Sequence, residues 1–167
     1  MRPLTTTEMF PEFASPVSGS HERLVRCVSL WQPWASLIAV GIKSVETRSW
    51  PAPATILGCR IAIHAAKTNK GMWLAAQDKE LWKVCLEALT FDERGFLPSG
   101  VIVATALVEV SIPTERLKPD IFGNFSQGRF GWMLADIRPL DTPIPAKGAQ
   151  GIFMASLDAS NEKLRDR

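Results

Sequence analysis

Apolar and polar residues alternate along much of the chain, and glycine and proline divide it into short segments. Six segments have the alternation or the β-branched composition of strands, and they are residues 24–30, 44–50, 58–66, 99–110, 129–140 and 151–157. Segments of helical composition separate some of these strands. The pattern therefore predicts a sheet that is interrupted by helices.

Residues 33–40 and 71–89 are the predicted helices. The first has Pro33 in its first turn, where proline is favoured, and ends before Gly41, the usual residue just past a helix. The second has an apolar stripe at helical spacing, formed by Leu74, Leu81, Cys85 and Ala88. About six strands with two or three helices predict an α+β fold, a small β-barrel with helices packed around it.

The length of 167 residues suits one domain with short tails. We expect an N-terminal extension at 1–22, a folded domain at 23–158 and a polar C-terminal tail at 159–167. The N-terminal residues lack the apolar core of a signal peptide, and no apolar stretch approaches the roughly 18 residues of a transmembrane helix. We therefore expect no membrane association.

Composition narrows the possible chemistry. The three cysteines are widely spaced and flanked by apolar residues, which predicts buried free thiols in a reducing cytoplasm. With two histidines and no Cys/His cluster, a zinc site is not expected. The sequence also lacks a P-loop, a GxGxxG motif and a GxSxG motif. We expect a cytoplasmic monomer without a metal or cofactor.

The net charge of +2 is unevenly distributed along the chain. Residues 21–70 carry a net charge of +5, whereas residues 71–120 carry −3. The near-neutral total gives no global indication of nucleic-acid binding. Positive charge is nevertheless concentrated in the early segment.

That early segment also contains the densest group of polar and aromatic residues. If residues 44–48 are extended, Glu46 and Arg48 point to the same side and can pair. Lys43 joins them only if it still lies in the turn after Gly41. Such a cluster could bind a polar planar group or perform acid–base chemistry. It could equally be a surface ion pair beside an ordinary turn.

The six tryptophans allow two interpretations of the same kind. Trp31, Trp34 and Trp50 could stack on a base, as aromatic residues do in proteins that bind single-stranded nucleic acids, or they could pack in the core. The alternation around Trp132 favours the core for that residue. Trp73 and Trp82 fall in the second predicted helix, where we expect them to be packing residues.

A histidine and two glycine-bounded loops complete the candidates. His64 has the small residue Ala62 beside it on one strand face, so it could border a ligand, although a structural role is commoner for a lone histidine. Residues 122–129 form a polar loop whose candidate contacts to phosphate or a base edge are Asn124, Phe125, Ser126 and Arg129. This loop, like residues 143–151, could also be a simple turn.

Five blocks of sequence resemble the ASCH domain family, the activating-signal-cointegrator homology family. The blocks are SLWQPW at 29–34, GIKSVETR at 41–48, IAIHAAK at 61–67, GRFGW at 128–132 and PAKGAQG at 145–151. They occur in family order and cover roughly residues 24–157. The resemblance implies a PUA-like fold in which the GxKxxExR motif borders a cleft.

The resemblance also implies two kinds of function. Members of this family are thought to bind RNA or other nucleic acids, whereas some hydrolyse an acylated cytidine and at least one is reported as a ribonuclease. The hydrolases of acylated cytidine use a Lys, a Thr and a Glu. Lys43 matches that Lys, but Glu46 occupies the position of the Thr.

We therefore carry two main hypotheses. The first is a domain that binds a nucleobase, possibly modified, or single-stranded nucleic acid, with Glu46 on a base edge and a tryptophan stacked on the base. The second is a hydrolase of a modified nucleoside or of RNA, with Lys43 and Glu46 as catalytic residues. A protein partner is a third option. The candidate binding residues are Trp31, Gln32, Pro33, Trp34, Lys43, Glu46, Arg48, Trp50, His64, Asn124, Phe125, Ser126 and Arg129.

Overall fold

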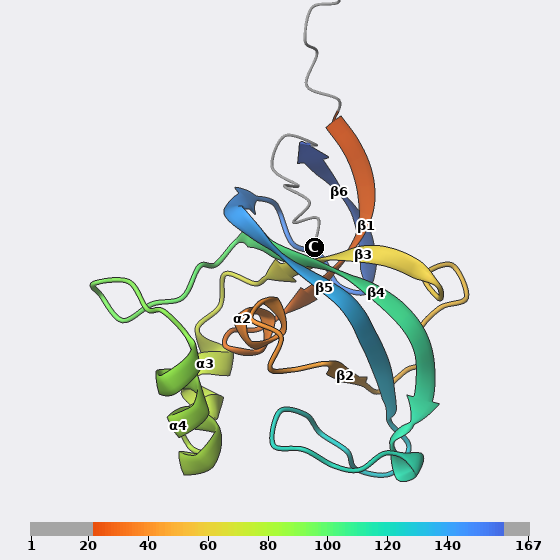
Figure 1. Ribbon diagram of the computed structural model, residues 1–167, viewed down its shortest axis with the longest axis horizontal. Coiled ribbons are helices and arrows are strands. Elements are labelled where there is room, and N and C mark those ends of the chain that lie inside the picture. Colours follow the sequence, from red (N-terminus) through yellow and green to blue (C-terminus); the bar gives the residue numbers. More distant parts are fainter. Residues whose placement is uncertain (1–21, 159–167) are drawn as a thin grey trace, which may run out of the picture.

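The six predicted strands pair into one mixed sheet in the computed structural model, which describes residues 22–158 (Figure 1). The strand order is β2-β5-β4-β3-β1-β6, and only β1 and β3 pair in parallel. The strands are β1 (Glu22–Leu30), β2 (Val45–Arg48), β3 (Cys59–Ala65), β4 (Val101–Pro113), β5 (Phe130–Pro145) and β6 (Ile152–Asp158). The prediction of an α+β fold with about six strands and two or three helices is confirmed.

The structure does not describe the two predicted tails. The C-terminal tail at 159–167 and all but the last residue of the extension at 1–22 lie outside the described residues. The domain boundaries therefore stay predictions.

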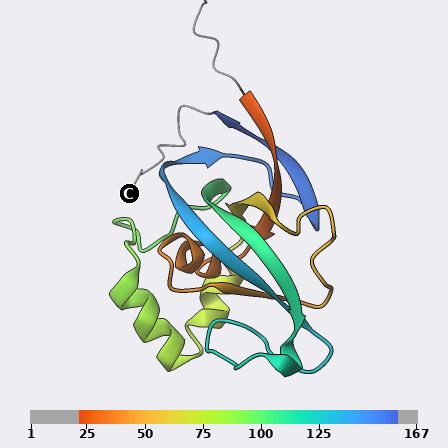
Figure 2. The same ribbon diagram turned by 45° about the vertical axis from the view of Figure 1, so that its right-hand side comes forward.

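The long strands β4 and β5 give the sheet its curvature. Their pairing shifts register at three places, between Ile102/Ala104, Thr105/Leu107 and Val108/Val110. Irregularities of this kind bend a strand pair and increase its twist. The two strands consequently run side by side in a long arc past helix α2, as both ribbon views show (Figure 2).

Helix α2 (Trp34–Ala39) lies where the sequence predicts it. Gly41 follows it with a φ of +80°, a left-handed conformation that glycine adopts without steric cost. The N–H of Gly41 donates to the carbonyl of Ile38 (2.8 Å), and the N–H of Lys43 donates to the carbonyl of Leu37 (3.1 Å). This turn directs the chain from α2 into β2.

The prediction of one continuous second helix is wrong. Residues 71–89 contain two helices, α3 (Lys70–Ala75) and α4 (Lys79–Ala88). Asp78 separates them, because its backbone is extended and its side chain accepts hydrogen bonds from the N–H groups of Glu80 and Leu81. The expected stripe is divided accordingly, with Leu81 and Cys85 buried but Leu74 40% exposed.

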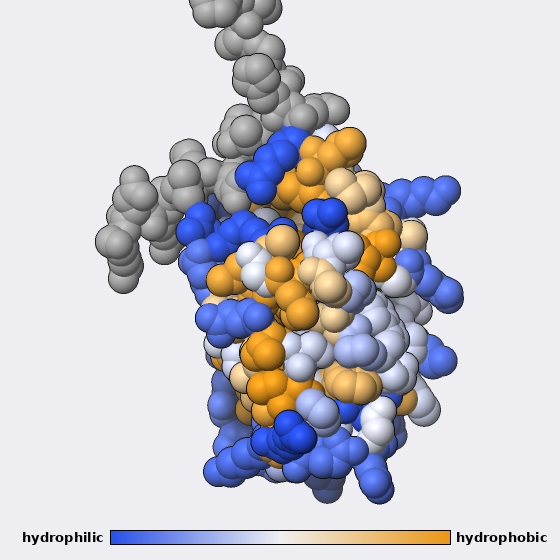
Figure 3. All heavy atoms as spheres, turned by 90° about the vertical axis from the view of Figure 1, so that its right-hand side faces the viewer, coloured by the Kyte–Doolittle hydropathy of each residue, from blue (hydrophilic) through white to orange (hydrophobic). Residues whose placement is uncertain are grey.

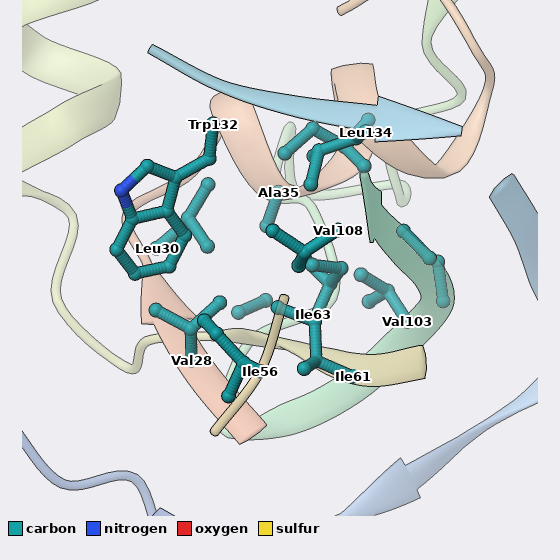
Figure 4. Close-up of a cluster of buried hydrophobic side chains, with 14 of the residues drawn as sticks. Val28, Leu30, Ala35, Ile56, Ile61, Ile63, Val103, Val108, Trp132 and Leu134 are labelled. Atoms are coloured by element: carbon teal, nitrogen blue, oxygen red, sulfur yellow. The ribbon is translucent and has the colours of Figure 1, made fainter. Parts of the chain in front are cut away.

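The core lies between the sheet and helix α2. Its largest cluster contains the fully buried Trp132 and aliphatic residues from β1, β3, β4 and α2 (Figure 4). The core position predicted for Trp132 is confirmed. A second cluster on the other side of β1 includes Cys27 and Ala62, and a third joins α2 to α4.

The three cysteines are free, as predicted. Cys27 and Cys85 are buried, whereas Cys59 is half-buried. Burial raises the pKa of the Cys27 thiol to about 12 and that of the Cys85 thiol to about 11. Both thiols therefore stay protonated at neutral pH and serve as packing groups.

Some large apolar residues remain at the surface. Figure 3 shows one face of the molecule on which apolar residues are interspersed with charged ones. Exposed apolar residues include Leu24 on β1 and Met154 on β6, which lie near each other across the β1–β6 ladder. Surface residues of this kind are ordinary in a folded protein.

We predict that Gly71→Ala destabilises the fold. Alanine normally gains up to about 1 kcal/mol over glycine in a helix. A Cβ at position 71 would overlap the carbonyl oxygen of Gln32 and would stand 2.6 Å from the Cβ of Trp31. We expect the free energy of unfolding to fall by roughly 1–3 kcal/mol in urea denaturation, as in other overpacked sites. A gain in stability would contradict the close contact between α3 and residues 31–34.

Candidate functional site

A cleft of about 690 Å³ lies beside the GxKxxExR motif. Its walls come from the end of β1, the start of α2, strand β2, residues 121–124 and the region around α3 and α4. The lining residues are Ser29, Leu30, Trp31, Trp34, Lys43, Glu46, Thr47, Arg48, Ser49, Trp50, Leu74, Asp78, Leu81, Ile121, Phe122, Gly123, Asn124 and Arg129.

Lys43 lies at the base of this cleft with only 1% of its surface exposed. Its Nζ donates to the carbonyl of Val45 and to the carbonyl of Phe122 (3.1 Å). The same Nζ lies 3.3 Å from Oε2 of Glu46. An ammonium has three N–H donors, so these three acceptors account for all of them.

Glu46 and Arg48 point to the same side of β2, as the alternation predicts. Oε1 of Glu46 lies 2.9 Å from Nε of Arg48, and this contact is an ion pair rather than an aligned hydrogen bond. Arg48 also donates from Nη2 to the carbonyl of Ser29 (2.9 Å) and lies over the ring of Trp132. The Glu46 side chain is 11% exposed, so the cluster is not an ordinary surface ion pair.

The polar loop contributes part of the opposite wall. Arg129 donates from Nε to the carbonyl of Asn124 (3.1 Å) and from Nη2 to the carbonyl of Thr47 (3.3 Å). Asn124 donates its N–H to Oγ1 of Thr47 (2.9 Å). A Cβ at Gly123 would stand 2.8 Å from Cγ2 of Thr47. Thr47 and Gly123 therefore hold the loop close against β2.

Three tryptophans border the cleft, as predicted. Trp31 is 39% exposed, and Nζ of Lys70 lies 5.1 Å from its ring centre. Trp34 is partly buried, and Trp50 makes an edge-to-face contact with Trp132 (4.8 Å between centres). Trp31 is therefore the most exposed of the three, and Lys70 lies over one face of its ring.

Of the two tryptophans predicted to be packing residues of the second helix, only Trp82 is one. Trp82 packs against the third core cluster, as expected, and makes an edge contact with Phe91. Trp73 is 65% exposed, so its expected packing role is wrong. The break at Asp78 ends α3 early and leaves Trp73 outside the buried stripe.

Five predicted site residues lie outside the cleft lining. Gln32 and Pro33 are buried at the start of α2, where Gln32 bonds to Ser36 and to the carbonyl of Pro98. Phe125 and Ser126 continue the loop beyond the cleft. His64 lies in a second cavity, where its Nδ1 bonds to Ser29 Oγ (2.8 Å) and its Nε2 to the carbonyl of Ala146 (3.1 Å).

Sequence reasoning missed several lining residues. Asp78 falls within the range of the predicted long helix and is therefore not identified, although an Asp before a helical run is a typical N-cap. Phe122 contributes a carbonyl to Lys43 from 79 residues away, and nothing in the spacing of the motif indicates this contact. Ser29 lies within the motif region, but strand alternation alone does not reveal its place in the wall of the cleft.

The cleft is suited to binding a flat polar group. Three cations and two carboxylates line it, and they leave a small positive excess. Each Glu46 oxygen contacts one cation, so lone pairs remain for donors on a ligand. Nζ of Lys43 faces three acceptors of the protein itself.

Among residues 22–158, no cluster of three or more His, Cys, Asp or Glu residues is placed to hold a metal ion. Within the same range, no helix has both the length and the apolar composition needed to cross a membrane.

These features define a small α+β domain with a motif-lined cleft, and the comparisons with known proteins agree with the motif blocks. The sequence profile of the ASCH domain matches residues 28–112, about half of the chain. The protein belongs to the ASCH domain family.

Solved structures similar to this chain include proteins from Zymomonas mobilis. The crystal structure of ASCH from Zymomonas mobilis is 19% identical, with coverage of 81% of this chain and 89% of that chain and a TM-score of 0.45. A mutant of the Zymomonas protein is 20% identical, with coverage of 72% and 74% and a TM-score of 0.43.

We predict that Glu46→Gln destabilises the protein. The substitution keeps the size of the side chain but removes the negative charge opposite buried Lys43. We expect the free energy of unfolding to fall by roughly 1–3 kcal/mol, the usual cost of an uncompensated buried polar group. Glu87→Gln is the matched control, because it removes the same charge from the exposed Lys83–Glu87 pair on α4. Equal effects of the two substitutions in urea denaturation would contradict the structural role of Glu46.

We predict a pH dependence of stability that comes from His64. Burial lowers the pKa of His64 below its ordinary value, although its bond to the Ala146 carbonyl partly opposes the shift. The unfolded chain therefore takes up a proton near pH 6.5 while the folded protein resists it, so stability is lost as the pH falls below about 6.5. Urea midpoints at pH 7.5 and 5.0 should differ more for the wild type than for His64→Gln. The same loss in both proteins would show that His64 does not contribute.

Proposed function

We propose that this ASCH domain binds a nucleobase of single-stranded RNA, or the corresponding nucleoside, in the cleft. The observation that carries the proposal is the Glu46 carboxylate, which two cations hold in a cavity bordered by tryptophans. A nucleobase combines N–H donors on its edge with a flat aromatic face. Glu46 would accept from the edge, and Trp31 would stack on the face.

The size and charge of the cleft support this ligand class. A volume of about 690 Å³ lies within the ordinary range of small-molecule sites. Arg48 and Arg129 are partly exposed at the lining and could contact a sugar or phosphate. The small positive excess of the lining suits a ligand that carries few phosphates.

The hydrolase hypothesis receives less support from the geometry. Hydrolysis through Lys43 would require Nζ to face the ligand, but Nζ is buried and its three polar neighbours are acceptors of the protein. Turnover of acylated cytidine and cleavage of labelled single-stranded RNA should therefore not exceed the level of a Lys43→Met control. Turnover that depends on Lys43 would favour the hydrolase.

We predict that Trp31→Ala weakens RNA binding. A fluorescein-labelled RNA dodecamer of mixed sequence, followed by fluorescence anisotropy, should bind the variant about tenfold more weakly, because stacking on one base is lost. Trp73→Ala is the matched control, since Trp73 is also exposed but does not line the cleft. Equal affinity of both variants and the wild type would argue against stacking on Trp31.

We also predict a shallow salt dependence for this binding. Arg48 and Arg129 are the cations of the lining that could contact phosphate, because Lys43 is buried against acceptors of the protein. With a slope of about −0.7 per phosphate for single strands, the plot of log K against log salt should be no steeper than about −2. A slope typical of eight phosphate contacts would indicate a broad electrostatic surface instead of a cleft.

A further inference from the structure

A second cavity of about 910 Å³ adjoins the cleft at Ser29. It lies between the ends of β1 and β3 and the loop that joins β5 to β6. Its lining consists of Ser29, His64, Ala66, Lys67, Thr68, Gly100, Pro145, Ala146, Lys147, Gly148, Ala149 and Gln150. Apart from Ser29, none of these residues lines the cleft proposed to bind the nucleobase.

Ser29 forms the wall between the two spaces. Its carbonyl accepts from Arg48, which belongs to the cleft. Its hydroxyl bonds to Nδ1 of His64, which belongs to the second cavity. A strand that places a base in the cleft could therefore continue past Ser29 into this neighbouring space.

The charge of the second cavity is positive. Lys67 and Lys147 line it, and its lining contains no carboxylate. His64 stays neutral because burial lowers its pKa. Within residues 22–158 neither lysine forms an ion pair, so both ammonium groups are available to an anion.

The framework that carries these lysines is fixed. Ala146 donates its N–H to Gly100 (3.1 Å) and accepts from His64, so the residue before Lys147 is held on both sides. A Cβ at Gly148 would stand 2.5 Å from Cε1 of His64, which shows how closely the loop packs on this histidine. The stem of Lys67 lies over Gly100, where a Cβ would meet its Cε.

From this arrangement we infer that the second cavity holds a backbone phosphate of the RNA strand whose base occupies the cleft. The inference rests on the proposed function of the cleft. A phosphodiester carries one negative charge and acceptor oxygens, which Lys67 and Lys147 would bind through charge-assisted hydrogen bonds. Such contacts position the strand and carry no sequence information of their own.

The test compares a nucleoside with a longer strand. We would measure the four ribonucleosides by calorimetry and a fluorescein-labelled RNA hexamer of mixed sequence by anisotropy, with a Lys67→Gln/Lys147→Gln variant. The matched control is Arg26→Gln/Lys83→Gln, which removes the same charge from two exposed residues outside both cavities. A Lys67→Arg/Lys147→Arg variant retains the charge.

We expect the Lys67→Gln/Lys147→Gln variant to bind the hexamer roughly tenfold more weakly and to show a salt slope shallower by about 1. Its nucleoside binding should match the wild type, and the arginine variant should restore hexamer binding. Hexamer affinity equal to that of the control would overturn the inference while leaving the cleft proposal intact. A competition experiment with inorganic phosphate provides a second check. Phosphate that binds to these lysines but does not displace the hexamer would also overturn the inference and leave the cleft proposal intact. If the wild type binds neither the nucleosides nor the hexamer, the cleft proposal is overturned, and the inference with it.

Discussion

The buried ammonium of Lys43 is the constraint on which the site depends. A charge removed from water is costly unless acceptors surround it, and Lys43 finds them on β2 and on residue 122. Satisfying this one group therefore brings together the turn after α2, strand β2 and the loop before β5. The walls of the cleft are a consequence of that requirement, because two of them consist of the segments that supply the acceptors.

The same constraint fixes the direction of Glu46. One carboxylate oxygen faces Lys43 and the other faces Arg48, so the side chain cannot swing away from either cation without losing an ion pair. Arg48 in turn holds the carbonyl of Ser29, and the hydroxyl of Ser29 holds His64. A chain of polar contacts thus runs from the cleft to the second cavity. A ligand that crosses Ser29 would meet side chains that are already ordered, which lowers the entropic cost of binding.

Local patterns predicted the strands well, because alternation reports which face of a strand is buried. The Glu46–Arg48 pair and the core position of Trp132 follow from that alternation. The break at Asp78 does not follow from the pattern, because the apolar stripe continues across it while the Asp78 carboxylate caps a new helix. The contact from Phe122 to Lys43 depends on how the long β4–β5 pair returns the chain. Such long-range contacts leave no trace in local spacing.

The residue at position 46 connects this geometry to the two functions that the family resemblance implies. The family resemblance implies a Thr at this position in the hydrolases of acylated cytidine, and a neutral hydroxyl cannot balance a buried ammonium as a carboxylate does. Glu46 supplies that balance, because its Oε2 lies 3.3 Å from Nζ of Lys43. The same exchange adds acceptor oxygens that face the cleft. The Glu46 carboxylate therefore has two effects in this structure, because it pairs with buried Lys43 and also places acceptor oxygens at the lining of the cleft.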